Sequence, residues 1–169
     1  CVGDGETYNV PVEMAETRYG IRVDEHSLHT DGAGAGEYRG GSGAVRVYRS
    51  MNENQTFTAS FGRNKWPVWG AAGGKDGSVN YFQFIDADGT VSEPMGIAAR
   101  RIMNTNDVVR MVTATGGGYG NPFKRPAEKV AMDVKNEYIT VEQAKADYGV
   151  LVDPETFKVL GLTKERQKA

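Results

Sequence analysis

Cysteine is nearly absent: the 169 residues contain one, Cys1. No intrachain disulfide can form, which fits a reducing compartment such as the cytoplasm. The chain starts at this cysteine instead of at a methionine. We expect Cys1 to be a boundary at which a longer polypeptide was cut. The alternative is a processed N-terminal nucleophile, but no neighbouring residue offers the base that such a group needs.

Long hydrophobic runs and an excess of basic residues are also lacking. No apolar run approaches the roughly 18 residues that a membrane-spanning helix requires, so no membrane partner is expected. The net charge of −2 argues against nucleic acid, which is bound through clustered basic residues. With 39% hydrophobic and 25% charged residues, the composition is that of an ordinary soluble protein with one domain, residues 1–169.

Glycine, in contrast, is abundant, with 22 residues. Most of them fall in three clusters, Gly32–Gly43, Gly70–Gly77 and Gly116–Gly120. The clusters separate short apolar runs, a pattern typical of strands joined by tight turns.

Residues 9–114 have the alternation of apolar and polar side chains that half-buried strands require. Val45 and Val47 share one face, for example, while Arg46 and Tyr48 share the other. The predicted strands are Ile21–Asp24, Ala44–Arg49, Thr56–Phe61, Tyr81–Ile85 and Val108–Thr113.

Residues 126–149 have a helical pattern instead. Pro126 suits the first turn of a helix, and the apolar residues that follow it recur at spacings of three and four. Thr140 and Gln143 have the spacing of a capping box, and Gly149 suits a left-handed helix end. The sequence therefore predicts an α+β fold: a mostly antiparallel sheet or sandwich followed by two short C-terminal helices. Val150–Val152 is expected to be extended. The tail, 154–169, ends in the charged stretch LTKERQKA, residues 162–169, which is expected to be frayed or weakly helical.

The stretch GAAGGKDG at Gly70–Gly77 invites comparison with a phosphate-binding P-loop. A P-loop needs four residues between its glycines and a hydroxyl after its lysine. Here three residues separate Gly70 from Gly74, and Asp76 follows Lys75. We therefore favour a loop that closely approaches another segment of backbone.

Other chemically suggestive residues have simpler interpretations. His26, His29 and Asp31 are close in sequence, but positions 26 and 29 of a strand face opposite sides, so surface or hydrogen-bonded histidines are favoured over a metal site. The scattered arginines suit either internal salt bridges or the carboxylates of a partner or substrate. Trp66 and Trp69 indicate a packing or interface role. No catalytic triad, cysteine–histidine pair or paired carboxylates stand out, so the catalytic residues stay unknown and no metal ligand is assigned.

Four blocks together resemble the hydantoinase B family, which includes the second half of 5-oxoprolinases and a subunit of ATP-dependent ketone carboxylases. The blocks are NVPVEMAETRYGIRVDEHSL at Asn9–Leu28, GAGAGEYRGGSGAVRVYR at Gly32–Arg49, WPVWGAAGGKDG at Trp66–Gly77, and the segment from Thr115 to Asp153 that begins TGGGYGNPFKRP. The resemblance covers roughly Asn9 to Asp153 and matches the C-terminal portion of the family. Gly20 stands where the family usually has proline.

The resemblance implies that this chain works with a hydantoinase A-type subunit that binds ATP and with the remainder of the hydantoinase B polypeptide. ATP and a divalent metal are expected in the complete enzyme, and no cofactor is expected on this chain. The expected reaction is opening of a cyclic amide such as a hydantoin or 5-oxoproline. The alternatives are carboxylation of a ketone and a non-catalytic assembly role. The isolated chain is expected to be inactive.

Glycine-rich loops with a basic residue suggest where a ligand or partner binds. Backbone N–H groups at Gly40 and Gly41, with the Arg39 guanidinium, suit an anionic group. Gly116, Gly117, Gly118 and Tyr119 are predicted to line a cleft. The Gly116–Gly120 cluster is interpreted as the exit from the last strand, because the following helix begins only near Pro126 and its N-terminus is too distant to help the glycines bind phosphate.

Overall fold

The computed structural model describes residues 10–168, so the interpretation of Cys1 lies outside the described residues. One helix and six consecutive strands are followed by a mostly helical segment that contains one further strand pair, and the predicted α+β class is confirmed. The helices are α1 (Val12–Tyr19), the 3₁₀ helix η1 (Pro122–Lys124), α2 (Ala127–Lys135), α3 (Val141–Tyr148) and α4 (Lys164–Gln167). The strands are β1 (Ile21–His29), β2 (Gly43–Ser50), β3 (Gln55–Ser60), β4 (Tyr81–Ile85), β5 (Ile97–Met103), β6 (Val108–Val112), β7 (Val150–Val152) and β8 (Val159–Leu162).

The chain folds into two compact units, each built from separate stretches of sequence. Of the described residues, the first unit contains 10–26, 46–60 and 82–111. The second contains residues 27–45, 61–81 and 112–168. None of the helices between residues 10 and 168 has both the length and the apolar character needed to cross a bilayer.

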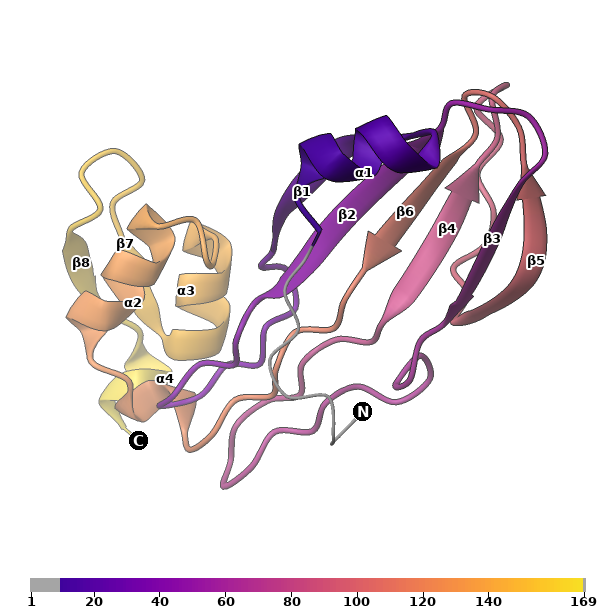
Figure 1. Cartoon of the computed structure of the whole chain (residues 1–169). Coiled ribbons are helices and arrows are strands. Elements are labelled where there is room, and N and C mark those ends of the chain that lie inside the picture. The colour runs from indigo at the N-terminus through magenta and orange to yellow at the C-terminus, as the bar shows by residue number, and fades with distance from the viewer. Residues whose placement is uncertain (1–9, 169) are drawn as a thin grey trace. The chain divides into compact units, whose positions relative to one another are not determined.

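The first unit contains most of a four-stranded sheet with the order β1-β2-β6-β4. The helix α1 lies along the β1–β2 side of this sheet (Figure 1). The alternation seen in the sequence matches the burial: Val47 is buried while Tyr48 is half-buried. Phe82 and Phe84 of β4 are almost fully buried as well, so one apolar face of the sheet supplies the core of this unit.

A second, two-stranded sheet pairs β3 with β5 in antiparallel register, Phe57 opposite Arg101. Phe57 makes edge-on ring contacts with Phe82 and Phe84, with centroids 5.6 and 5.4 Å apart. A bulge interrupts the register between Phe57 and Ala59, and Arg100 on the facing strand has a left-handed φ of 53°. The aromatic contacts join the small sheet to the core of the first unit.

The helix α1 and the strand β5 were not predicted from the sequence, which indicated two C-terminal helices and five sheet strands. The only buried residue of α1 is Ala15, so its sequence shows no apolar stripe. Gly20 caps the helix with a φ of 61°, a left-handed conformation that proline cannot adopt because its ring fixes φ near −65°. The departure from the family pattern at Gly20 thus has a local structural role.

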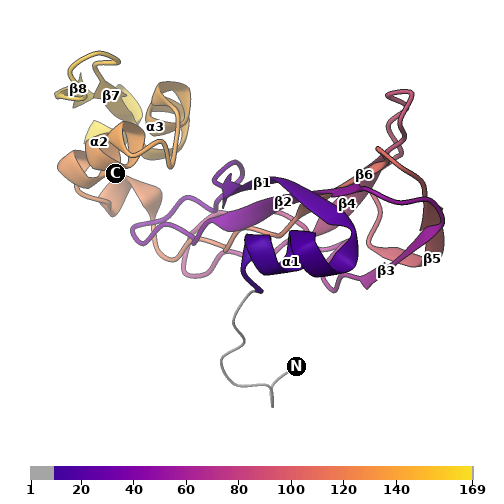
Figure 2. The same ribbon diagram turned by 45° about the horizontal axis from the view of Figure 1, so that its top comes forward.

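In the second unit, α2, α3, β7 and β8 pack together (Figure 2). Their core consists of Ala35, Val130, Ala131, Val134, Ile139, Ala144, Tyr148, Val150 and Val152. The predicted capping box at Thr140 and Gln143 is confirmed, as is the left-handed cap at Gly149. The strand β8, which pairs with β7, was not predicted. The short helix α4, capped by Thr163, agrees with the expectation of a weakly helical tail.

Candidate functional site

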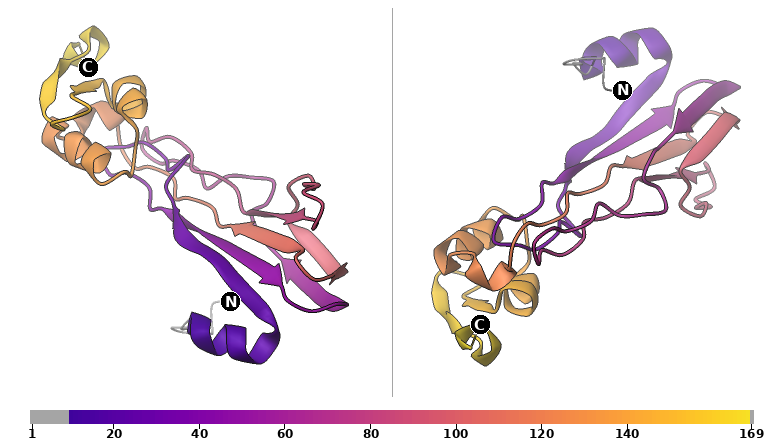
Figure 3. Two further views of the ribbon diagram at one scale, coloured as in Figure 1. Left: turned by 90° about the horizontal axis from the view of Figure 1, so that it is seen from above. Right: turned by 90° about the horizontal axis from the view of Figure 1, so that it is seen from below.

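Three glycine-rich segments that are far apart in the sequence meet in the second unit, where they run side by side (Figure 3). We call residues 34–43, 70–77 and 116–120 the glycine web. Gly34 N–H donates to the Gly116 carbonyl at 2.9 Å, and Gly116 N–H donates to the Gly41 carbonyl at 2.8 Å. Gly118 N–H donates to the Lys75 carbonyl at 2.9 Å. Backbone N–H and carbonyl groups of all three segments are therefore paired with one another by hydrogen bonds.

The glycine web leaves no space for side chains at its central positions. A Cβ atom added to Gly40 would collide with the backbone of Gly116, and one added to Gly118 would collide with Ala35. A Cβ at Gly74 would meet the Gly118 carbonyl in the same way. These contacts confirm the predicted close backbone approach of the Gly70–Gly77 loop. They explain why glycine is needed at these three positions without any left-handed backbone angle.

The two charged residues of the Gly70–Gly77 loop have partners inside the chain. An Asp76 carboxylate oxygen accepts a hydrogen bond from Gly70 N–H at 2.8 Å. Lys75 forms an ion pair with Asp147 at the C-terminal end of α3. The hydrogen bond shapes the loop, and the ion pair fixes it to the helical part of this unit.

Thr115 lies directly before the third segment of the web and connects it to residues next to the other two segments, a role that the sequence analysis did not assign to it. It is fully buried, and its hydroxyl donates to the Gly32 carbonyl at 2.8 Å. Ser78 N–H donates to the same hydroxyl, and Thr115 N–H donates back to the Ser78 hydroxyl, each at 2.9 Å. A threonine before three glycines is the only sequence signal of this connection.

Arg39 belongs to the first segment of the web, and its guanidinium faces other residues of this chain. It donates to the Gly40 carbonyl at 3.0 Å, lies 4.7 Å from the centre of the Tyr138 ring, and its Nε is 3.7 Å from the Asp133 carboxylate. Its side chain is only 13% exposed. The binding role of Arg39, Gly40 and Gly41 stays a prediction; what the structure shows is an anchor for the loop.

Asp133 is a buried carboxylate shared by two arginines, Arg39 and Arg125. The Arg125 Nε donates to Asp133 Oδ2 at 3.0 Å, and the Arg125 Nη2 lies 2.8 Å from the same oxygen. The Arg125 Nη1 also donates to the Glu37 carbonyl. Burial raises the pKa of the nearby Tyr148 phenol, so that group stays neutral at physiological pH. Because removing the carboxylate would leave buried positive charge unpaired, Asp133 is a structural requirement of this unit.

Tyr119 is exposed and pairs with Tyr38 across the web. Each N–H donates to the other residue's carbonyl, at 2.9 and 3.0 Å, and their ring centroids are 6.2 Å apart. The glycines that precede Tyr119 are packed between backbone segments, so the chain around them is close-packed. The predicted cleft-lining role of Gly116, Gly117, Gly118 and Tyr119 stays a prediction.

The Gly116–Gly120 segment is confirmed as the connection from the last sheet strand to the helices. β6 ends at Val112, and Asn121 caps η1 by accepting a hydrogen bond from Phe123 N–H at 2.9 Å. The helix α2 begins only at Ala127. His29, the other residue considered for chemistry near this end of the sheet, is hydrogen-bonded through Nδ1 to the Thr113 carbonyl at 2.9 Å.

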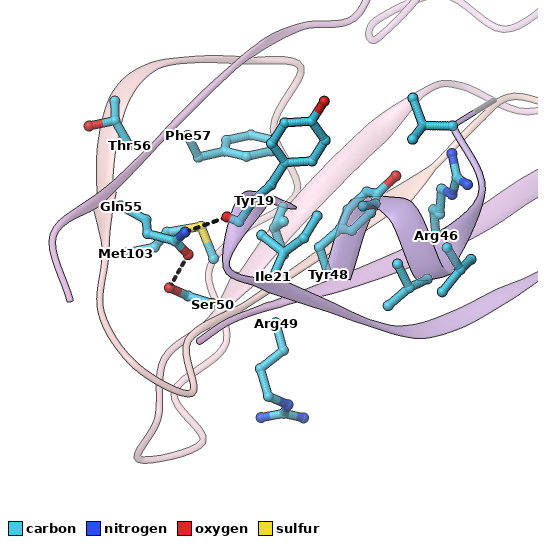
Figure 4. Close-up of a pocket in the computed structure, with 15 residues that line it drawn as sticks. Tyr19, Ile21, Arg46, Tyr48, Arg49, Ser50, Gln55, Thr56, Phe57 and Met103 are labelled. Carbon is cyan, nitrogen blue, oxygen red and sulfur yellow. Dashed lines mark hydrogen bonds between the residues drawn. The ribbon is translucent and has the colours of Figure 1, made fainter. Parts of the chain in front are cut away.

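The first unit contains a groove of about 730 Å³ between α1, the sheet and β3 (Figure 4). Its lining residues are Val10, Val12, Ala15, Tyr19, Ile21, Val23, Arg46, Tyr48, Arg49, Ser50, Gln55, Thr56, Phe57, Met103 and Val109. The volume lies in the range of small-molecule sites, roughly 300–1,000 Å³. Sequence periodicity placed Arg46 and Tyr48 on one face of a strand but gave no sign of α1, which forms one wall.

Several polar groups that line the groove already have partners within the chain. The Ser50 hydroxyl donates to the Gln55 side-chain carbonyl at 2.6 Å, and the Gln55 amide donates to the Tyr19 carbonyl at 2.9 Å (Figure 4). Arg49 extends away from the other lining side chains and bonds Asp24 at 2.8 Å through Nε. The groove therefore offers mainly apolar surface, which suits apolar side chains better than a polar substrate.

Comparison with known proteins agrees with the sequence resemblance. The chain is 32% identical over 148 residues to a protein assigned as the B component of a D-/L-hydantoinase from Pseudomonas sp. (strain NS671), covering 86% of this chain and 25% of that protein. It is 30% identical over 158 residues to the beta chain of the caprolactamase of Pseudomonas jessenii, covering 84% and 25%. The chain thus spans about a quarter of the length of these curated relatives.

Solved structures show the same relationship. The ATP-dependent caprolactamase from Pseudomonas jessenii matches with a TM-score of 0.71 at 29% identity, covering 92% of this chain and 26% of that one. A nucleotide-free acetone carboxylase matches with a TM-score of 0.74 at 16% identity, covering 96% and 26%, which shows a shared fold. The family model described as hydantoinase B/oxoprolinase matches residues 1–122. The chain therefore belongs to the hydantoinase B/oxoprolinase family.

Proposed function

We propose that this chain is the C-terminal part of the B-type component of an ATP-dependent enzyme that opens a cyclic amide. The observation that carries the proposal is the likeness to an ATP-dependent caprolactamase over 92% of the chain, at 29% identity and a TM-score of 0.71. Caprolactam, hydantoins and 5-oxoproline share a ring amide bond, so the substrate class is a lactam or related cyclic amide. The single cysteine supports a cytoplasmic location.

Within that enzyme, the role of this chain is assembly rather than chemistry. The residues that we considered for binding are engaged in holding loops together, as Arg39 is by Asp133 and Tyr138. The ATP-binding fold comes from a hydantoinase A-type subunit, and the remainder of the B-type polypeptide completes the enzyme. The isolated chain is accordingly inactive.

ATP and a divalent metal belong to the complete enzyme in this proposal. Between residues 10 and 168, no three histidine, cysteine, aspartate or glutamate side chains come together in a way that could hold a metal ion. The described part of this chain thus does not fit a metal centre, and we assign no metal-dependent step to it.

Reconstitution tests the proposal. The complex of the A-type subunit, the remaining B-type polypeptide and this chain is assayed with ATP and caprolactam, a hydantoin or 5-oxoproline. We expect release of the ring-opened acid together with ADP, and no product when ATP or this chain is omitted. Carboxylation of acetone with bicarbonate, with no ring opening, would place the chain in the carboxylase branch instead. Ring opening by this chain alone would overturn the assembly role.

A further inference from the structure

The groove of the first unit opens an apolar core to solvent (Figure 4). Its volume of about 730 Å³ is far above the roughly 30 Å³ share of one water molecule, and protein interiors leave few voids larger than that. Among its lining residues, Met103 and Val109 are buried, whereas Val10 and Tyr19 are 50% and 57% exposed. Four more lining side chains are half-buried: Val12, Ile21, Val23 and Phe57. Apolar side chains therefore reach the surface in one depression, which is typical of a contact site.

The groove offers little that would hold a charged or polar ligand. Of the 15 described residues that line it, Arg46 and Arg49 alone carry a charge, and none is acidic. Asp24 balances the charge of Arg49, at 2.6 Å, and the Arg46 guanidinium lies 5.5 Å from the centre of the Tyr48 ring. The serine hydroxyl and the glutamine amide of the groove already bond each other. Contact with apolar side chains is therefore what the groove favours.

The helix α1, which forms one wall of the groove, is packed on one side only. It has eight residues, and isolated helices shorter than about 12–15 residues are marginal in water, so a helix of this length depends on packing. Ala15 is its only buried residue, and Met14 and Tyr19 are 41% and 57% exposed. Glu16 ties it to β1 by accepting a hydrogen bond from Val23 N–H at 2.9 Å. A segment lying in the groove would contact Tyr19 and pack against α1.

The comparisons indicate where such a segment comes from. This chain spans about a quarter of the length of the hydantoinase and caprolactamase relatives, so about three quarters of each relative lies outside the match. Val10, with which the described residues begin, lines the groove. In the proposed enzyme, the preceding part of the B-type polypeptide is joined to this chain near that residue. A covalent link of this kind gives a nearby segment a high effective concentration, whereas a separate subunit or a second copy must bind from solution.

We propose that the groove holds apolar side chains from the part of the B-type polypeptide that precedes this chain. One segment of that polypeptide then completes the core of the first unit. The inference rests on the proposed function, which makes this chain the C-terminal part of the same polypeptide. The segment is a run of aliphatic or aromatic residues, because a polar group buried in the groove would lose its bonds to water.

Hydroxyl-radical footprinting tests whether the groove is covered. Mass spectrometry compares the oxidation of Tyr19 in the complete B-type polypeptide with that in this chain by itself, whose folding is checked by circular dichroism. We expect Tyr19 to be oxidised at least about fivefold more slowly in the complete polypeptide, because side chains at the centre of a contact are desolvated. Equal rates would overturn the inference. So would slow oxidation that appears when this chain alone is concentrated, since a second copy would then be the occupant.

Photocrosslinking identifies the occupant. Tyr19 is replaced by the photoreactive residue benzoylphenylalanine in the complete polypeptide, and the crosslinked peptides are sequenced. We expect an apolar peptide from the part of the polypeptide outside this chain. Ile97 takes the same probe as the matched control, because it is 67% exposed in the same unit but does not line the groove. Crosslinks from position 19 only to this chain or to the A-type subunit, or the same peptide from both positions, would overturn the inference.

The lactam-opening assay separates this inference from the proposed function. A complete enzyme that opens lactams while Tyr19 stays accessible to radicals would remove the role of the groove and leave the function standing. Protection of Tyr19 in an enzyme that carboxylates acetone instead would leave the role of the groove standing and overturn the substrate class.

Discussion

The glycine web and the core of the first unit are packed in opposite ways. In the web, backbone touches backbone, and the large aromatic residues project outward. In the first unit, side chains such as Phe57, Phe82 and Phe84 pack against one another, and the surface beside them is a groove. The web can therefore lose its structure by gaining one methyl group, whereas the aromatic core loses stability when atoms are removed.

Gly40→Ala should have the largest effect of any single substitution considered, because the new Cβ would overlap the Gly116 carbonyl. We expect a loss of about 3 kcal/mol in unfolding free energy, measured by urea denaturation. Gly41→Ala is the control at the adjacent position, where an added Cβ meets nothing within 4 Å. It should change stability by less than about 0.5 kcal/mol. Equal effects of the two variants would show that the close approach is not what requires glycine.

Phe57→Ala tests the other side of the comparison. It removes two edge-on ring contacts and opens the end of the groove. Since Phe57 is half-buried, we expect a loss of about 2 kcal/mol, below the range for fully buried phenylalanines. Ser60→Ala, on an exposed position of the same strand, serves as the control. A loss no greater than that of the control would contradict the packing role.

Thr140→Ala should cost about 1 kcal/mol, because it removes the hydroxyl that accepts the Gln143 N–H at 3.1 Å. Thr140→Ser keeps a hydroxyl at the cap and should be nearly neutral. Thermal denaturation followed by circular dichroism measures both. If the serine and alanine variants lowered the stability of the protein equally, the hydrogen bond to Gln143 N–H would not explain how Thr140 stabilises the helix.

Substitution of Asp24 should have the smallest effect on the unfolding free energy, and that effect should depend on pH. Hydrogen bonding to Arg22, with a further contribution from Arg49, lowers the pKa of Asp24 below its ordinary value. The carboxylate therefore stabilises the fold above about pH 4, and this contribution is lost as the pH falls through the folded-state pKa. Asp24→Asn should reduce the unfolding free energy by less than about 1 kcal/mol at pH 7, and by progressively less as the pH is lowered, as measured by urea denaturation. A difference that does not shrink as the pH falls would contradict this assignment.

The sequence predicted those elements whose residues alternate or repeat. The strand β4 has the predicted bounds, Tyr81–Ile85, because its alternation and the following turn are both clear. The helix α1 was missed because it buries one alanine, and β5 was missed because most of its side chains are exposed and Arg100 breaks its regularity. In both cases, pairing or packing with distant residues decides the structure more than local pattern does.

The candidate site was only partly predictable for a related reason. Glycine at 40, 74 and 118 signals that something approaches closely, but a backbone contact leaves no trace in the sequence of its partner. Likewise, nothing in the sequence around Arg39 indicated that its guanidinium would pair with the carboxylate of Asp133. Asp133 lies on α2, which begins after the last glycine cluster. Trp66 and Trp69 were open to a packing or an interface role, and their exposure favours the interface.

The glycine web also sets the order in which the chain can fold. Gly34 bonds Gly116, and Gly40 lies against the same residue, so the web closes long stretches of intervening chain. Closing such loops costs entropy before any contact compensates for it, which makes non-local structure slow to form. During synthesis the web cannot form until Gly118 has left the ribosome. We therefore expect Tyr38 and Tyr119, which the web positions, to reach their final places only after this unit is complete.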